Sequence, residues 1–375
     1  MQPKTIGINA HLLSRQHGYR RAGIHHYIAQ ILRHLPPPDD TLRYTVFTGD
    51  APDLLRDLPV RVAESAWRTD GPLARIAWEQ LAWPSAMVRE KVDLVHSMAF
   101  VTPFLNPRPA VVTVYDLSFM IYPEAFPRAQ RLYLQTQTRR SVRAARHVLA
   151  ISESGRQDIH HYFGVPLAQI SVVYPGVEAR FRPLPPEQVA AFRAEKALPE
   201  TFLLHVGTLQ PRKNIPVLLE ALAQTERPDL HLVLVGGKGW LYDEIFARVR
   251  ALGLAERVHF AGYVPDEELP LWYNTAVSLT FPSVYEGFGM PIVQSLACGT
   301  PVIAANTSAM PEAVGDAGWL FPPDDASALA ERIIEACDDS QQVAHKRARG
   351  LVQGQRFSWH TAGQQTAEIY RRCVT

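Results

Sequence analysis

Two short stretches in the second half of the 375-residue chain combine charged side chains with the predicted start of a helix. In the first, 207-GTLQPRKN-214, Arg212 and Lys213 follow a buried strand and directly precede a helix. Unpaired N–H groups and the helix dipole make a helix N-terminus favourable to anions. Two cations there are unfavourable for the helix alone, so we expect a bound anion to compensate them. A solvated turn is the alternative interpretation.

The second stretch, 285-YEGFGMPIVQSLACGTP-301, repeats this arrangement on another loop. Glu286 comes before Gly287 and Gly289, and glycine lets the backbone approach a ligand closely. Pro291 suits the first position of the helix that follows. The glycines alone would indicate only a capped helix. Together with the Arg-Lys loop in the same half, they predict a ligand site.

Gln294 lies in this predicted helix, four residues after Met290 and on the same face. Because helical side chains lean toward the N-terminus, we expect Gln294 to point back toward the loop of Glu286. It stands eight positions after Glu286, where a second acid would be expected if the site used two.

The first half carries weaker signals. The stretch 7-GINAHLLSRQHGYRRAGIHHYI-28 predicts a strand, a loop with Gly18 and Gly23, and a helix whose amides could meet a phosphate. It lacks GxGxxG, which disfavours a dinucleotide site for hydride transfer. His96 and Asp116 lie at predicted strand ends, where they could contact a substrate hydroxyl or transfer a proton. A purely structural role is the alternative for the histidine.

The sequence also lacks several patterns that would indicate other chemistry. No HExxH, CxxC, GxSxG or GxxxxGK[ST] motif occurs, and the Asp doublets lie in polar turns, so we predict no metal site and no cofactor. Three cysteines without metal-like spacing indicate free thiols in a reducing compartment. The N-terminus has no signal-peptide pattern and no run reaches eighteen apolar residues, so we expect a cytoplasmic protein.

Short apolar runs alternate with helical patterns in both halves, which predicts an α/β protein with doubly wound parallel sheets. The length suits two domains, and the proline-rich stretch 175-PGVEARFRPLPPEQ-188 separates them. We predict domains over residues 1–180 and 181–358, and a terminal helix over 359–375 that packs back on the first domain. Two such domains would face a central cleft, with ligands at the carboxyl ends of the strands.

Charge is divided unevenly between the halves. Residues 1–175 hold 20 Lys and Arg against 14 Asp and Glu, whereas the remainder holds 18 against 23. Within the basic half, Arg139, Arg143 and His147 recur at helical spacing. A basic first half indicates an anionic ligand or a membrane-surface partner. Ordinary surface variation is the alternative.

At the level of whole motifs, the chain resembles retaining glycosyltransferases of the GT-B fold, in the large family 4 (group 1), and specifically its bacterial mannosyltransferase-like members. The resemblance covers nearly the whole chain. It rests on GTLQPRKN, FAGYVPDEELPLWYNTA, FPSVYEGFGMPIVQSLACGTPVIAA and SAMPEAVGDAG in the second half, and on AGIHHYIAQIL, VYDLSFMIYPEAF and ARHVLAISESGRQDI in the first. It implies two Rossmann-like domains and a nucleotide diphosphate sugar bound mainly by the second. No nucleic-acid partner is expected.

The resemblance further implies roles for residues of the second half. Arg212 and Lys213 would bind the diphosphate and stabilise it as the leaving group. Glu286 would accept hydrogen bonds from the hydroxyls of the donor sugar, and Gln294 would meet the ribose. The remaining donor-side positions are Gly207 beside the diphosphate, Tyr263 and Val264 flanking the base, and the loop residues Gly287, Phe288, Gly289 and Met290.

On the acceptor side, the resemblance implies that Asp116, His96 and the Gly18–Gly23 loop face the reacting sugars. The family often has His-Asp where this chain has Tyr115-Asp116, and a tyrosine cannot act as a protonated imidazole. Gln294 replaces the second acid of the family's E-x7-E motif. A neutral hydrogen bond is worth roughly 0.5–1.5 kcal/mol against about 1.5–3 kcal/mol for a charged one. We therefore expect weaker donor binding with the fold and the chemical step intact.

The sequence thus predicts a retaining, metal-independent glycosyltransferase that moves a hexose, in our interpretation mannose from GDP-mannose, to a glycan or lipid-linked acceptor. Cations aimed at the phosphates would stabilise the charge that develops as the glycosyl–phosphate bond breaks. The basic half adds an expected peripheral association with the inner membrane face. Three alternatives stay open: a UDP-sugar-dependent transferase, a nucleotide-sugar-binding protein without turnover, and a non-hydrolysing sugar epimerase of the same fold.

Overall fold

A computed structural model describes residues 2–13, 23–49, 52–65, 67, 71–237, 239 and 243–374. The chain forms two compact units. Unit 1 comprises Met1–Gly176 and Trp359–Thr375, and unit 2 comprises Val177–Ser358.

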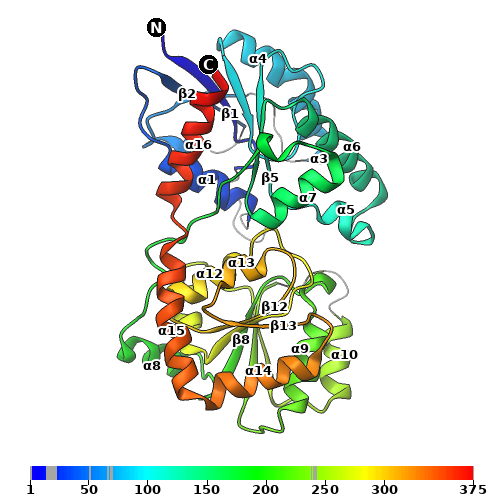
Figure 1. The fold of residues 1–375 in the computed structure, drawn as a ribbon, viewed down its shortest axis with the longest axis vertical. Coiled ribbons are helices and arrows are strands. Elements are labelled where there is room, and N and C mark those ends of the chain that lie inside the picture. Colours follow the sequence, from blue (N-terminus) through cyan, green and yellow to red (C-terminus); the bar gives the residue numbers. More distant parts are fainter. Residues whose placement is uncertain are drawn as a thin grey trace. The chain divides into compact units, whose positions relative to one another are not determined.

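Unit 1 is built on a sheet of seven parallel strands in the order β3-β2-β1-β4-β5-β6-β7 (Figure 1). The strand segment AVVTV of β5 is buried at every position, as expected where helices cover both faces of a parallel sheet. The strands are β1 Lys4–Asn9, β2 Leu42–Thr48, β3 Arg61–Glu64, β4 Leu94–Ser97, β5 Ala110–Val114, β6 His147–Ala150 and β7 Ile170–Val172.

The last helix of the chain, α16, belongs to unit 1 and packs against α1 (Figure 1). A side chain at Gly363 would lie 2.0 Å from the carbonyl oxygen of His34, so the two helices approach at backbone distance. The helical segments are α1 Ile24–His34, α2 Pro52–Leu55, α3 Pro72–Ala77, the π-helical η2 Trp78–Ala82, α4 Trp83–Arg89, α5 Ser118–Ile121, η3 Pro123–Ala125, α6 Arg128–Ala144, α7 Glu153–Phe163, η4 Leu167–Gln169 and α16 Trp359–Val374.

Unit 2 repeats the architecture with six parallel strands in the order β10-β9-β8-β11-β12-β13. The strands are β8 Phe202–Val206, β9 His231–Val235, β10 Val258–Gly262, β11 Ser278–Phe281, β12 Val302–Ala305 and β13 Trp319–Phe321. The helical segments are α8 Pro186–Glu195, η5 Pro211–Lys213, α9 Ile215–Gln224, α10 Asp243–Ala251, α11 Leu269–Thr275, α12 Met290–Ala297, α13 Met310–Val314, α14 Ala326–Asp338 and α15 Ser340–Gln355.

These strand orders confirm the predicted pair of doubly wound, Rossmann-like sheets. In each sheet the order reverses at one point, between β1 and β4 in unit 1 and between β8 and β11 in unit 2. Open α/β sheets bind ligands outside the carboxyl ends of the strands at this switch point. Each unit therefore has one favoured place for a ligand. Of the described helices, none has both the length and the apolar character needed to cross a bilayer.

Candidate functional site

The two charged stretches of the second half meet at the switch point of unit 2. Arg212 and Lys213 lie on η5, which follows β8, and Glu286 lies in the loop that follows β11. The Lys213 ammonium Nζ is 2.6 Å from Glu286 Oε1, and Arg212 Nη1 is 2.9 Å from Glu286 Oε2. Two cations thus share one carboxylate. The cluster carries a net positive charge at the place where the topology favours a ligand.

Burial makes these charges unusual. Only 9% of the Lys213 side chain and 12% of the Glu286 side chain are exposed. Burial lowers the pKa of Lys213, and the ion pair with Glu286 opposes that change. For Glu286, burial alone would raise the pKa, but Lys213 and Arg212 together bring it down to about 2. At neutral pH the carboxyl group is therefore ionised.

The backbone around the cluster is fixed by its own contacts. The N–H of Glu286 donates to Ser308 Oγ at 2.9 Å, and Arg212 Nη1 donates to the carbonyl oxygen of Tyr285. Ser308 has φ of +47°, which is uncommon for a residue with a side chain and marks local strain. No sequence pattern distinguishes this serine, which positions Glu286 from a loop 22 residues further along the chain.

His205 on β8 borders the ammonium of Lys213. Its Nδ1 donates to the carbonyl oxygen of Thr280 at 3.1 Å, and within the described residues its Nε2 has no hydrogen-bond partner. A side chain at Gly207 would lie 3.1 Å from Lys213 Cε and 3.4 Å from His205 Nε2. Burial, followed by the charge of Lys213, lowers the pKa of His205 to about 4, so the imidazole is neutral. Glycine at position 207 thus leaves room for the lysine.

The loop after β9 supports this glycine from the other side. A Cβ atom at Gly236 would lie 2.0 Å from the carbonyl oxygen of Gly207, whereas one at Gly237 would meet nothing within 4 Å. We expect Gly236→Ala to destabilise unit 2 by about 1–3 kcal/mol, as overpacking does. Displacement of Gly207 should also weaken the binding of an anionic ligand at the adjacent Lys213. Melting temperature and titration calorimetry test this, with Gly237→Ala as the matched control; equal behaviour of the two variants would contradict it.

The glycine-rich loop leads into α12 as the sequence indicates. Gly289 has φ of +100° and precedes Met290, the first residue of the helix. Phe288 is buried, with its ring 5.1 Å from that of Phe357. The Oε1 atom of Gln294 accepts a hydrogen bond from the Tyr273 hydroxyl at 3.1 Å, and the expectation that this side chain points to the Glu286 loop stays a prediction. The side chain is therefore held against α11.

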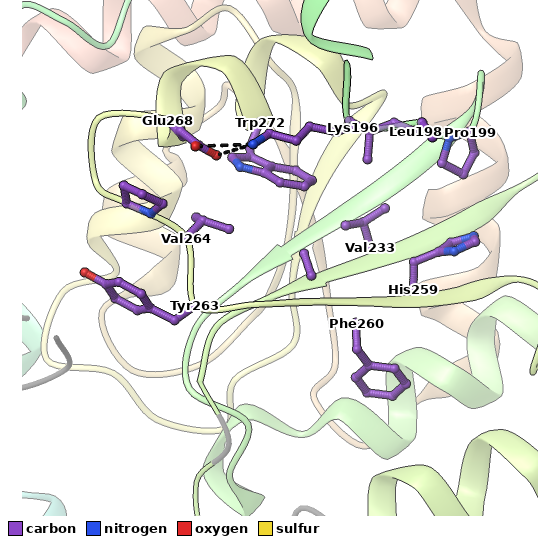
Figure 2. Close-up of a pocket in the computed structure, with 13 residues that line it drawn as sticks. Lys196, Leu198, Pro199, Val233, His259, Phe260, Tyr263, Val264, Glu268 and Trp272 are labelled. Atoms are coloured by element: carbon purple, nitrogen blue, oxygen red, sulfur yellow. Dashed lines mark hydrogen bonds and ion pairs between the residues drawn. The ribbon is translucent and has the colours of Figure 1, made fainter. Parts of the chain in front are cut away.

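Tyr263 and Val264 lie at one end of a cavity of about 420 Å³ (Figure 2). The cavity follows β10 toward Lys196 and Pro199, and Lys196 is paired with Glu268 across it at 3.3 Å. Arg212, Lys213 and Glu286 are not among its lining residues. We therefore assign only the Tyr263 end, at the carboxyl end of β10, to the candidate site.

Two family models match successive parts of the chain. The family model described as "Glycosyl transferases group 1" matches residues 188–351, and the model described as "Glycosyltransferase Family 4" matches residues 21–181. An O-antigen chain mannosyltransferase B of Escherichia coli is 33% identical over 294 residues, which cover 77% of this chain and 76% of that protein. The chain belongs to the group 1, family 4 glycosyltransferases.

This glycosyltransferase is also similar to a second known enzyme and to a solved crystal structure. A D-inositol 3-phosphate glycosyltransferase of Streptomyces scabiei is 35% identical over 258 residues, which cover 64% of this chain and 56% of that enzyme. The crystal structure of Anabaena Alr3699/HepE in complex with UDP and glucose superposes with a TM-score of 0.75 at 23% identity, covering 98% of this chain and all of the other. That superposition establishes the shared fold.

Two residues that were expected to face the acceptor, His96 and Tyr115, are buried in the interior of unit 1. His96 is 1% exposed, with Nδ1 2.6 Å from the Tyr370 hydroxyl and Nε2 2.7 Å from Thr113 Oγ1. Tyr115 is 6% exposed and donates its hydroxyl to the carbonyl oxygen of Met98 at 2.6 Å. The expectation that these side chains face a substrate is corrected, because buried partners already occupy their polar atoms.

Asp116 is placed differently. It lines a cavity of unit 1, and its Oδ1 accepts hydrogen bonds from the backbone N–H of Ser118 at 2.8 Å and from the Ser118 hydroxyl at 2.6 Å. Gly23 precedes α1 with φ of +63° and is exposed. Gly18 lies outside the described residues. Asp116 is thus a predicted first-half residue whose side chain reaches a cavity of the described part of unit 1.

Proposed function

We propose that this glycosyltransferase is a retaining, metal-independent mannosyltransferase that uses GDP-mannose and acts on a glycan or lipid-linked acceptor. The cluster of Arg212, Lys213 and Glu286 at the switch point of unit 2 carries the proposal. The mannosyltransferase name of the Escherichia coli relative supports mannose as the sugar.

The proposed chemistry follows from the charges of the cluster. The diphosphate of the donor displaces part of the internal pairing and takes Arg212 and Lys213 as counterions. As the glycosyl–phosphate bond breaks, negative charge grows on the departing phosphate, where two fixed cations stabilise it without rearrangement. Glu286 accepts hydrogen bonds from the sugar hydroxyls. The acceptor hydroxyl attacks from the side the phosphate leaves, and the departing phosphate takes its proton, so configuration is retained.

Donor screening tests this function. GDP-mannose should raise the melting temperature of the full-length protein, and nucleotide release with candidate acceptors should proceed equally with and without EDTA. Stabilisation and turnover by UDP-sugars alone would reassign the donor. Stabilisation without any nucleotide release would favour a binding protein without turnover, and loss of turnover in EDTA would contradict metal independence.

Gln294 gives a modest prediction for the same site. We place it at the donor ribose, in agreement with its position at the start of the second turn of α12. Gln294→Glu should tighten donor binding by a few-fold, because a charged acceptor makes the stronger hydrogen bond. The carboxylate can still accept from the Tyr273 hydroxyl, so α11 and α12 keep their contact. Calorimetric titration with GDP-mannose measures the effect; weakening as severe as loss of Glu286 would contradict the placement.

We also propose that unit 1 docks on an anionic membrane surface through the tip Phe104–Leu105. These side chains are 67% and 77% exposed, and the Arg140 guanidinium lies 5.0 Å over the Phe104 ring. Arg139 is exposed on the neighbouring helix α6. Exposed apolar groups beside arginines match the interface of an anionic bilayer.

A vesicle assay tests this docking. The double substitution Phe104→Ser with Leu105→Ser should lower co-sedimentation with phosphatidylglycerol vesicles about tenfold, and Arg139→Gln should lower it less. Arg140 and Arg143 are left unchanged because they donate to the carbonyl oxygens of Thr102 and Phe163. Val352→Ser, an exposed apolar residue of unit 2, is the control. Unchanged sedimentation of the double variant would reject the tip as the docking surface.

A further inference from the structure

The cavity at the edge of the unit 2 sheet extends well beyond its Tyr263 end. It has a volume of about 420 Å³ and runs along β10 to residues 196–199, which follow α8 (Figure 2). This volume falls in the range of roughly 300–1,000 Å³ that small-molecule sites occupy. We name its far end the Lys196 pocket, and its walls include Lys196, Leu198, Pro199, Val233, Glu268 and Trp272.

Trp272 places an unpaired hydrogen-bond donor in the Lys196 pocket. The side chain lies on α11 and is 4% exposed, and within the described residues its Nε1 atom has no hydrogen-bond partner. The indole N–H is a donor only, so it can be satisfied only by an acceptor. Folded proteins rarely leave a buried polar group without a partner. The pocket therefore lacks an acceptor that a ligand would supply.

A charged pair lies beside this indole. Lys196 Nζ is 3.3 Å from both carboxylate oxygens of Glu268 and 3.4 Å from Glu195 Oε1. The carbonyl oxygen of Glu268 accepts the backbone N–H of Trp272 at 3.2 Å, so these two side chains lie one helical turn apart. Lys196 and Trp272 also share a neighbour, the ring of Phe192. Because the Lys196 and Glu268 side chains are each 30% exposed, a ligand can reach both charges.

The charges of the pocket favour a ligand that carries both signs. Lys196, Glu268 and Glu195 together carry one negative charge, so a simple carboxylate would meet a net repulsion. A simple amine would pair with Glu268 but would leave the indole N–H of Trp272 unsatisfied. A zwitterion meets both requirements: its carboxylate accepts from Trp272 and Lys196, and its ammonium group takes the place of Lys196 at Glu268.

The remaining walls are apolar and rigid. Leu198, Pro199 and Val233 line the pocket without any hydrogen-bonding side chain. The carbonyl oxygen of Pro199 accepts a hydrogen bond from Arg193 Nη1 at 2.8 Å, which fixes this wall. Ala197 turns the chain into it with φ of +48°, which is uncommon for a residue with a side chain. A wall fixed in advance loses little freedom when an apolar group binds.

We propose that the Lys196 pocket binds a free α-amino acid with an apolar side chain, such as leucine or phenylalanine. The carboxylate binds Trp272 Nε1 and Lys196, the ammonium group binds Glu268, and the side chain lies against the apolar walls. Lys196 keeps Glu195 as a second counterion. This site goes beyond the proposed transfer reaction, because Arg212, Lys213 and Glu286 are not among the residues that line the cavity.

Three small probes test the zwitterion requirement. L-leucine, 4-methylpentanoate, which lacks the ammonium group, and 3-methylbutylamine, which lacks the carboxylate, share one branched apolar end. Calorimetric titration of the full-length protein should give leucine an affinity about tenfold or more above that of each analogue, because each analogue loses hydrogen bonds to charged groups. An analogue that binds as tightly as leucine would overturn the proposal. So would the absence of binding by both leucine and phenylalanine.

Trp272→Phe tests the indole N–H, because it keeps an aromatic side chain and removes the donor. Leucine affinity should fall about tenfold, the effect of losing one hydrogen bond to a charged group. Trp83→Phe is the matched control. Trp83 lies in unit 1, is fully buried, and its Nε1 atom likewise has no partner among the described residues, yet it does not line the cavity. Native leucine affinity in the Trp272→Phe protein would contradict the assigned role.

Glu268→Gln tests the ammonium site and does so on a half-exposed side chain, so it also decides the matter if Trp272→Phe does not fold. Leucine affinity should fall about tenfold, whereas affinity for 4-methylpentanoate should stay the same or rise, because the acid that repels it is gone. A pair that serves only the fold would weaken both ligands alike, and that result would reject the site. Glu220→Gln, which removes an acid paired with Arg248, should leave both affinities native.

A nucleotide competition shows whether the pocket is separate from the donor site. Leucine should bind within about threefold of its native affinity when the protein is saturated with GDP or UDP, because the Lys196 pocket lies away from the diphosphate-binding cations. Loss of leucine binding in the presence of either nucleotide would show that the base occupies the pocket, and it would overturn the proposal. A protein that binds leucine but no sugar nucleotide would overturn the proposed function and support the pocket.

Discussion

Glu286→Gln is expected to lower transfer about 100- to 1,000-fold while affinity for the free nucleoside diphosphate is kept or raised. The loss in rate is that of removing one preorganised group from the transition state. The opposite change in affinity has a separate cause: Arg212 and Lys213 lose the internal carboxylate that now sits 2.9 Å and 2.6 Å from them. Both cations then become available to the phosphates. Misfolding would lower both quantities together.

Single-turnover transfer and calorimetric titration with nucleoside diphosphate measure the two effects. Glu220→Gln is the matched control, because it removes an acid that pairs with Arg248 elsewhere in unit 2. That variant should keep native transfer and native affinity. A Glu286→Gln enzyme within about threefold of the native rate would remove Glu286 from the reacting sugar. Diphosphate binding lost along with transfer would point to a structural role instead.

The fold was predictable because each of its parts is local. Buried strands such as AVVTV in β5 are continuous apolar runs, and helices such as α9 and α14 carry the 3.6-residue period. Strand order in a doubly wound sheet then follows from short right-handed connections. A terminal helix that packs back on the first domain was among the predictions from the sequence, but no local pattern encodes the contact it makes there, the close approach of Gly363 to α1.

The donor-side cluster was predictable for a similar reason. Arg212, Lys213 and Glu286 each lie in a loop that directly follows a strand, and neighbouring parallel strands end at the same edge of a sheet. Their pairing joins residues 73 positions apart and rests on tertiary geometry alone. Gln294 shows the limit of this reasoning. Helix geometry predicts the direction of its side chain but not its hydrogen bond with the Tyr273 hydroxyl.

The acceptor-side residues were harder because type and spacing do not show burial. His96 ends a strand as a catalytic histidine would, yet two buried hydroxyls occupy its ring nitrogens. Glu79 gave no signal, since a lone acid in WEQLA resembles any solvated helical residue. Its contact with His11, 68 residues earlier in the chain, appears only where η2 turns it onto that residue. The tertiary fold brings these two residues together, and nothing in their residue types or spacing predicts that contact.

Lys213→Met should abolish most of the transfer, by about 100- to 1,000-fold, without lowering the stability of unit 2. Methionine fills a volume similar to the lysine stem and carries no charge into a site where Lys213 is 7% exposed. Replacing a whole buried ion pair by well-packed apolar side chains is often neutral or stabilising by about 1–4 kcal/mol, and removing one partner is costly mainly because it leaves the other charge unpaired. Glu286 keeps Arg212 at 2.9 Å, so no acid is left unpaired. The diphosphate, however, loses a fixed cation.

A lysine that serves function and not folding is identified by a variant that loses the transfer rate but keeps the melting temperature. Burial lowers the pKa of Lys213, so the fold holds this ammonium at a cost that the ion pair with Glu286 offsets in part and that a bound anion would offset further. The Lys213 ammonium lies over the Phe281 ring, 4.8 Å from its centre. Lys346→Met is the matched control, since the Lys346 ammonium also lies over an aromatic ring, 5.8 Å from the centre of that of Trp319 and away from the cluster. It should transfer at the native rate. A Lys213→Met protein with a melting temperature far below that of the native protein, or with native transfer activity, would contradict this prediction. The ammonium would then stabilise the packing around Phe281 and would not bind the departing phosphate.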